Sequence, residues 1–76
     1  KILVVDDSKT LLAMMKEFLE NESYSVRTAL SVEEALPLIK KAEFDLVIMD
    51  IRMPGLNGLQ ALTEIKKIDP KLSVII

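Results

Sequence analysis

Residues 2–8 read ILVVDDS, and this short stretch decides the fold. Its four leading aliphatic residues are typical of a strand that is buried on both faces of a parallel sheet. Two adjacent aspartates, Asp6 and Asp7, follow directly, and a helical pattern begins at Ser8. Like charges repel, so the acidic pair needs an explanation. The aspartates either cap the helix or hold a cation.

The same change from strand pattern to helix pattern recurs along the chain. Strand patterns return at residues 24–29, 44–50 and 72–76, and helical spacing separates them at residues 8–22, 31–42 and 59–68. The order βαβαβαβ predicts an α/β fold, a parallel sheet with helices on its faces. The side chains expected to face inward from the three helices are Leu11, Met14, Met15, Phe18, Leu19, Ala35, Leu36, Ile39, Ala42, Leu59, Leu62, Ile65 and Ile68.

The second helix carries one signal in its favour and one against it. Ser31 and Glu34 form a capping box, in which the serine accepts a bond from the Glu34 amide and the glutamate reaches back. Pro37 lies beyond the first turn, where a proline removes a hydrogen bond and costs about 3 kcal/mol. This helix is therefore the weakest of the three predictions.

Length and composition exclude several kinds of function. The 76 residues allow one domain, 50% of them are hydrophobic, and the formal charge is −2. Because the net charge is negative and no part of the sequence is strongly basic, the segment is not expected to bind nucleic acid. The chain has no Cys and no His, so disulfides, thiolate sites and histidine-based catalysis are excluded. No apolar run is long enough to span a membrane and no signal-peptide pattern opens the chain, so we expect a cytoplasmic protein without membrane contact.

Acidic residues follow two strands at equivalent places. Asp6 and Asp7 follow the first strand, and Asp50 follows the third. Ligands of open parallel sheets bind outside the carboxyl ends of the strands, so the three carboxylates converge if these strands are neighbours. Oxygen-only ligands favour a hard cation, and Mg²⁺ before most others. A carboxylate beside such a metal can also attack phosphorus and form an aspartyl phosphate.

Taken together, ILVVDDS, DLVIMDIRMPGLNG and the strand-helix alternation resemble the receiver domain of a two-component response regulator. The resemblance covers residues 1–76, as one partial receiver domain, and implies a flavodoxin-like fold with strand order 2-1-3-4. It implies that Asp50 is the phosphoacceptor. It also implies that Asp6, Asp7, Asp50 and the backbone carbonyl of Arg52 bind Mg²⁺. The implied phosphoryl donor is a phosphohistidine on a sensor histidine kinase, and no turnover of an external substrate is expected.

The sequence departs from the family pattern at its end. The family has a fifth strand and two more helices, and the Ser or Thr and the Lys that contact the phosphoryl group lie in the parts that this sequence lacks. We therefore expect a fragment of a longer protein, which could carry an effector domain. The apolar run at residues 72–76 would then form an exposed edge strand, through which two copies could pair.

Two other functions are compatible with the sequence. The chain could be a flavodoxin-like interaction module or fragment without phosphotransfer activity. A Mg²⁺-dependent phosphohydrolase with an aspartate nucleophile is a weaker alternative. Such an enzyme would want a second acid two residues after Asp50, where Arg52 stands.

Overall fold

The computed structural model describes residues 1–42, 44–50 and 58–75. Strands and helices alternate throughout these residues, as the sequence pattern predicts. The elements are β1 (Ile2–Val5), α1 (Lys9–Asn21), β2 (Val26–Ala29), α2 (Val32–Lys41), β3 (Leu46–Met49), α3 (Gly58–Ile68) and β4 (Ser73–Ile75). None of these helices is long and apolar enough to cross a membrane.

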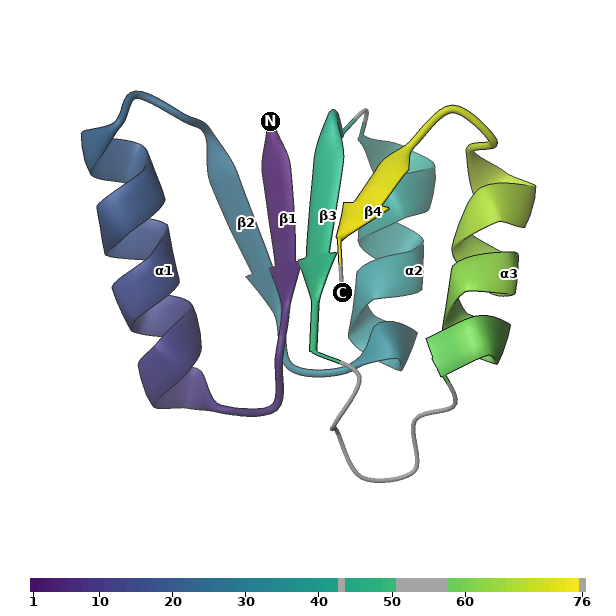
Figure 1. The fold of residues 1–76 in the computed structure, drawn as a ribbon, viewed down its shortest axis with the longest axis horizontal. Coiled ribbons are helices and arrows are strands. Elements are labelled where there is room, and N and C mark those ends of the chain that lie inside the picture. Colours follow the sequence, from purple (N-terminus) through teal and green to yellow (C-terminus); the bar gives the residue numbers. More distant parts are fainter. Residues whose placement is uncertain (43, 51–57, 76) are drawn as a thin grey trace.

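The strands form one parallel sheet in the order β2-β1-β3-β4, which confirms the predicted topology (Figure 1). β1 lies between β2 and β3, so strands that are distant in the sequence become neighbours. Ile2 pairs with Val26 on one side and with Leu46 on the other. β4 pairs with β3, from Leu46 opposite Ser73 to Ile48 opposite Ile75. This register aligns the carboxyl ends of β1 and β3 at the same end of the sheet, which we call the carboxyl edge.

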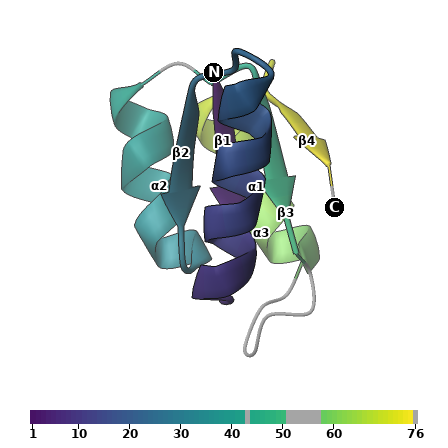
Figure 2. The same cartoon turned by 90° about the vertical axis from the view of Figure 1, so that its left-hand side faces the viewer.

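Helices cover the two faces of the sheet unequally. α1 lies on one face, and α2 and α3 lie side by side on the other (Figures 1 and 2). Because side chains alternate along a strand, β1 contributes to both faces. Leu3 and Val5 belong to the larger core beneath α2 and α3, whereas Ile2 and Val4 belong to the smaller core beneath α1.

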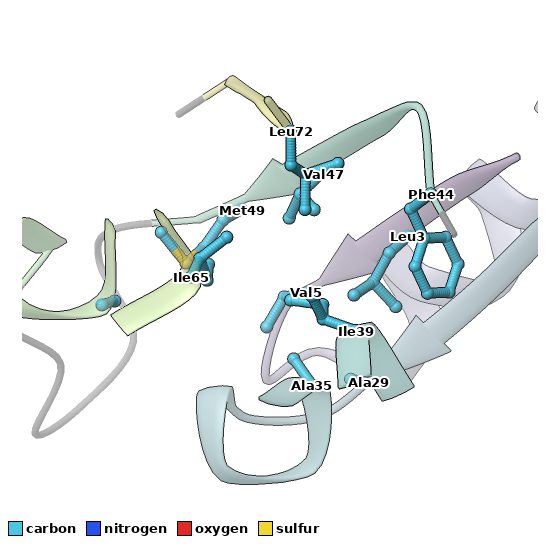
Figure 3. Packing of buried hydrophobic residues seen from close by; sticks show 11 residues of the cluster. Leu3, Val5, Ala29, Ala35, Ile39, Phe44, Val47, Met49, Ile65 and Leu72 are labelled. Carbon is cyan, nitrogen blue, oxygen red and sulfur yellow. The ribbon is translucent and has the colours of Figure 1, made fainter. Parts of the chain in front are cut away.

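The larger core is closely packed and entirely apolar. Leu3, Val47 and Ile65 are completely buried in it, and they come from β1, β3 and α3 (Figure 3). Ala35 and Ile39 of α2 close the same cluster (Figure 3). This core fixes the positions of β1 and β3, the two strands that carry the aspartates.

The inward face predicted for α1 is partly wrong. Leu11, Met14 and Phe18 are exposed, with 65% of Phe18 accessible to solvent. The buried residue is Leu12, and Met15 and Leu19 pack beside it. The helix therefore rests on a narrower stripe than its apolar residues suggest. In α3, Leu59 was also predicted to face inward and is 74% exposed.

Serine caps begin both α1 and α2. Ser8 Oγ accepts a hydrogen bond from the Leu11 amide at 3.2 Å. Ser31 Oγ accepts one from the Glu34 amide at 3.2 Å, which confirms that half of the capping box. Glu34 reaches back to the amide of Leu30, again at 3.2 Å. Pro37 does not break α2, which continues to Lys41.

Candidate functional site

The candidate site lies at the carboxyl ends of β1 and β3. Val5 and Met49, the last residues of the two strands, are partners in the sheet. Immediately beyond them, the Asp50 amide donates to the Val5 carbonyl at 3.1 Å, and the Asp6 amide donates to the Ala29 carbonyl at 3.1 Å. Asp6 and Asp50 thus leave the sheet at the same edge, and backbone bonds hold both residues in place. The predicted meeting of the two segments at this edge is confirmed.

Asp6 is buried, although it carries a carboxylate. Only 5% of the residue is exposed, and its Oδ1 accepts a hydrogen bond from the Ser8 amide at 2.9 Å. This bond closes a short turn between β1 and α1 and fixes the direction of the carboxylate. Because Ser8 caps the helix, capping does not account for the acidic pair.

The two other aspartates at this edge lie nearer the solvent. Asp7 is exposed and Asp50 is half-buried. Asp50 makes a further interaction besides its backbone bond to Val5, so the residue is not isolated. Oxygen-only donors suit a hard cation such as Mg²⁺, and a buried carboxylate with two more acidic residues at the same sheet edge fits that chemistry.

A compact metal cluster is not formed by the described side chains. Among residues 1–42, 44–50 and 58–75, no three acidic side chains are close enough together to hold one ion. Arg52, whose carbonyl was predicted as a ligand, lies outside the described residues. The ligand set of Asp6, Asp7, Asp50 and Arg52 therefore stays a prediction.

Asp45 lies at the opposite edge of the sheet, before β3 begins. Its amide donates to the Lys1 carbonyl at 2.8 Å, and its carboxylate accepts a bond from the Lys1 terminal ammonium at 2.6 Å. This hydrogen bond and the positive charge of the ammonium lower the pKa of Asp45. Asp45 is therefore separate from the candidate site.

Three residues of α1 that the helical spacing assigns to the core lie on the surface instead. Leu11, Met14 and Phe18 form an exposed apolar stripe, which we call the α1 stripe. Exposed apolar patches of this kind mark interaction sites more often than single exposed residues do. The signal was present in the sequence, because α1 has more apolar residues than one buried stripe needs.

Comparison with known proteins places this arrangement in a family. The family model for the response regulator receiver domain matches residues 2–76. Chemotaxis protein CheY of Thermotoga maritima is 38% identical to the chain, with 100% of the chain and 64% of CheY aligned. The chain spans less than two thirds of these relatives, and only 28% of the transcriptional regulatory protein YvrH of Bacillus subtilis, which is 42% identical over 87% of the chain.

Solved structures agree with the fold. Response regulator protein TrrA of Thermotoga maritima, in complex with Mg²⁺ and BeF, superposes with a TM-score of 0.88 at 43% identity, over 99% of this chain and 65% of TrrA. TrrA in complex with histidine kinase ThkA gives a TM-score of 0.86 at 42% identity, over 96% of this chain and 63% of that one. The fold is therefore flavodoxin-like, as the sequence predicts.

Proposed function

The chain belongs to the family of response regulator receiver domains, and on this basis we propose that Asp50 accepts a phosphoryl group from a phosphohistidine of a sensor histidine kinase. One observation carries the proposal. Asp50 directly follows β3, beside the buried Asp6, and its amide is bonded to Val5 of β1. A nucleophile must be held in place to react efficiently, and two paired strands supply that rigidity.

The transfer exchanges one bond to phosphorus for another. An Asp50 carboxylate oxygen attacks the phosphorus of the phosphohistidine, and a P–O bond forms while the P–N bond breaks. The electron pair of the P–N bond returns to the imidazole nitrogen, which then takes a proton from solvent. The product is an aspartyl phosphate on this chain and a free histidine on the kinase.

A divalent cation is part of the proposal, because the reaction collects negative charge at one edge of the sheet. Asp7, Asp6 and Asp50, together with the Arg52 carbonyl, would hold Mg²⁺. The bound ion would offset the charge of the phosphoryl group and the carboxylates. The TrrA complex with Mg²⁺ and BeF supports this choice of metal for the family. The bond from the Ser8 amide to Asp6 Oδ1 supports a part for Asp6, because it holds the carboxylate in one orientation.

Three wider proposals follow from the family. The protein acts as a signalling switch in the cytoplasm and turns over no external substrate. The kinase complex of TrrA supports a sensor kinase as its partner. Because the chain spans 28% of the regulatory protein YvrH, residues 1–76 could serve as the receiver of a longer protein with an effector domain.

Intact-mass spectrometry tests the acceptor directly. The longest natural polypeptide containing residues 1–76 is incubated with acetyl phosphate and Mg²⁺, and we expect a gain of one phosphoryl group. Asp50→Asn should abolish the gain, because the amide lacks the nucleophilic oxygen. Asp45→Asn, an exposed aspartate at the opposite edge, is the matched control and should be phosphorylated normally. An equal gain in Asp50→Asn would disprove the assignment and leave the interaction module as the better alternative.

A further inference from the structure

β2 is an edge strand, and its outer side is open within the part of the chain that the structure describes. The carbonyls of Ser25 and Ala29 accept bonds from the amides of Ile2 and Asp6, at 2.7 and 3.1 Å. In a parallel pair, alternate residues direct their backbone groups to the same neighbour. Val26 and Thr28 therefore direct their N–H and C=O groups away from β1, where another strand can bind them.

A groove runs beside this open edge, between β2 and α1. Its volume is about 360 Å³, and its lining residues are Lys9, Leu12, Ala13, Lys16, Thr28 and Leu30. The floor is mostly apolar, and the rim contributed by α1 carries the two lysines. We call this the β2 groove.

The charge on the rim is positive and has no described partner. Lys9 and Lys16 are seven residues apart, which places them on the same side of α1, and both are exposed. Neither makes a hydrogen bond or an ion pair with any residue in the described ranges. Of the neighbouring acids, Asp7 precedes the helix, Glu17 directly follows Lys16, and Glu20 lies one turn beyond Lys16; none of the three lines the groove. The half of the groove between Lys9 and Lys16 is thus cationic.

We propose that the β2 groove docks an acidic, extended segment of a partner protein, which adds as a strand to β2. The backbone of this segment would pair with Val26 and Thr28. Its acidic side chains on the α1 side would pair with the ammonium groups of Lys9 and Lys16. The aliphatic stems of the two lysines would lie over Leu12 and Leu30. Strand addition of this kind takes affinity from backbone bonds and specificity from alternate side chains.

This surface is distinct from the α1 stripe. Helical spacing puts Lys9, Ala13 and Lys16 on the side of α1 that faces the β2 edge, whereas the α1 stripe lies on the opposite side. An interaction at the α1 stripe and segment docking in the β2 groove need no shared residue. The inference is therefore independent of the proposed phosphotransfer.

Nuclear magnetic resonance can test the pairing without any substitution. The probe is a synthetic peptide in which glutamate alternates with threonine, and a lysine–threonine peptide of equal length is the control. We expect the acidic peptide to slow hydrogen exchange at the Val26 and Thr28 amides. The Arg27 and Ala29 amides face β1 and should change little. No binding, or protection that does not alternate in this way, would overturn the proposal.

Substitutions test the charge requirement. The double variant Lys9→Glu/Lys16→Glu should bind the acidic peptide about tenfold more weakly at low salt and gain affinity for the lysine–threonine peptide. Lys40→Glu/Lys41→Glu, which makes the same charge change at the end of α2, should bind as the unmodified protein does. Equal loss in both variants would show a nonspecific charge effect and reject the site. Binding of a single-stranded oligonucleotide with the same lysine dependence and no amide protection would also reject strand addition.

Discussion

Asp6 and Asp7 are neighbours in the chain and differ sharply in environment. Asp6 is buried and bonded to the Ser8 amide, whereas Asp7 is exposed. The difference arises in the turn between β1 and α1. The Asp6 carboxylate accepts the hydrogen bond that closes this turn, whereas the Asp7 side chain makes no such bond and is exposed to solvent. A buried carboxylate loses hydration, so a cation at this edge would relieve a cost that Asp6 bears and Asp7 does not.

We predict that Asp7 contributes to Mg²⁺ affinity without contributing to stability. Asp7→Ala should weaken Mg²⁺ binding by about tenfold or more, because the site loses one of its few anionic oxygens. Its melting temperature without metal should change little, since Asp7 is exposed and caps no helix. Isothermal titration measures the first effect and calorimetry the second. Asp45→Ala is the control, and equal Mg²⁺ heat in Asp7→Ala and the unmodified protein would contradict the site.

Ser23 is a residue whose backbone suits glycine better. Its φ angle is 73°, in the left-handed region, directly after the cap of α1. The left-handed conformation strains a non-glycine residue by about 1–2 kcal/mol, and glycine removes this strain. Glycine also loses more conformational entropy on folding, which offsets part of the gain. Ser23→Gly should therefore stabilise the fold by about 0.5–1 kcal/mol in urea denaturation. Ser25→Gly, two residues on and without a positive φ, should destabilise it; a gain in both variants would refute the argument.

At the scale of elements, α1 shows what periodicity can and cannot predict. The helical spacing gave the helix and its bounds to within a residue or two, because hydrogen-bonded turns depend on local sequence. It did not give the buried face, since apolar residues cover a wide arc of α1. Which part of that arc is buried depends on how β1 and β2 pair and on which face of the sheet α1 covers, and helical spacing alone does not determine either. Leu12, absent from the predicted face, is the residue that the sheet buries.

The α1 stripe is our candidate for kinase docking. Phe18→Ser should slow phosphotransfer from the sensor kinase about tenfold, because one exposed aromatic ring can supply much of the binding energy of an interface. Folding should be unaffected, since 65% of Phe18 is exposed. Transfer from acetyl phosphate should also be unchanged, which separates docking from chemistry.

Leu59→Ser provides the matched control for that measurement. Leu59 is 74% exposed and lies on α3, on the other face of the sheet. The substitution removes a similar apolar surface away from the α1 stripe. Equal slowing by Leu59→Ser and Phe18→Ser, or no slowing by either, would remove the stripe from the docking surface.

For the whole molecule, topology was more predictable than the site. Strand-helix alternation favours parallel pairing and crossovers of one hand, which leaves few arrangements, and the resemblance to receiver domains selects the order β2-β1-β3-β4 among them. The shared edge of Asp6 and Asp50 follows from that order alone. The spacing of the carboxylates does not, because it depends on loop geometry and on side-chain rotamers. Arg52 lies in the stretch that the structure does not describe.

The unequal cover of the sheet has a consequence for β4. A helix is about 10 Å wide and strands are about 4.8 Å apart, so one helix covers about two strands. On its face, α1 contacts β2 and β1. Beyond the cover of α1, Leu46 and Ile48 of β3 are only half-buried, and 53% of Ile75 in β4 is exposed. In the described residues, β4 pairs only with β3, so its outer edge is open as well as apolar.

Open apolar edges pair with other chains, and we therefore predict that the 76-residue chain self-associates through β4. Ile75→Lys should suppress this association, because a charged side chain on an edge strand disfavours pairing and costs little in the monomer at an exposed position. Light scattering over a range of concentrations measures the effect. Leu59→Lys removes an apolar residue that is still more exposed, at 74% against 53% for Ile75, away from the sheet edge and should leave association unchanged. A clean monomer at high concentration would refute the prediction. Association that persists in Ile75→Lys would show that copies meet through another surface, and the α1 stripe would then be the first to test.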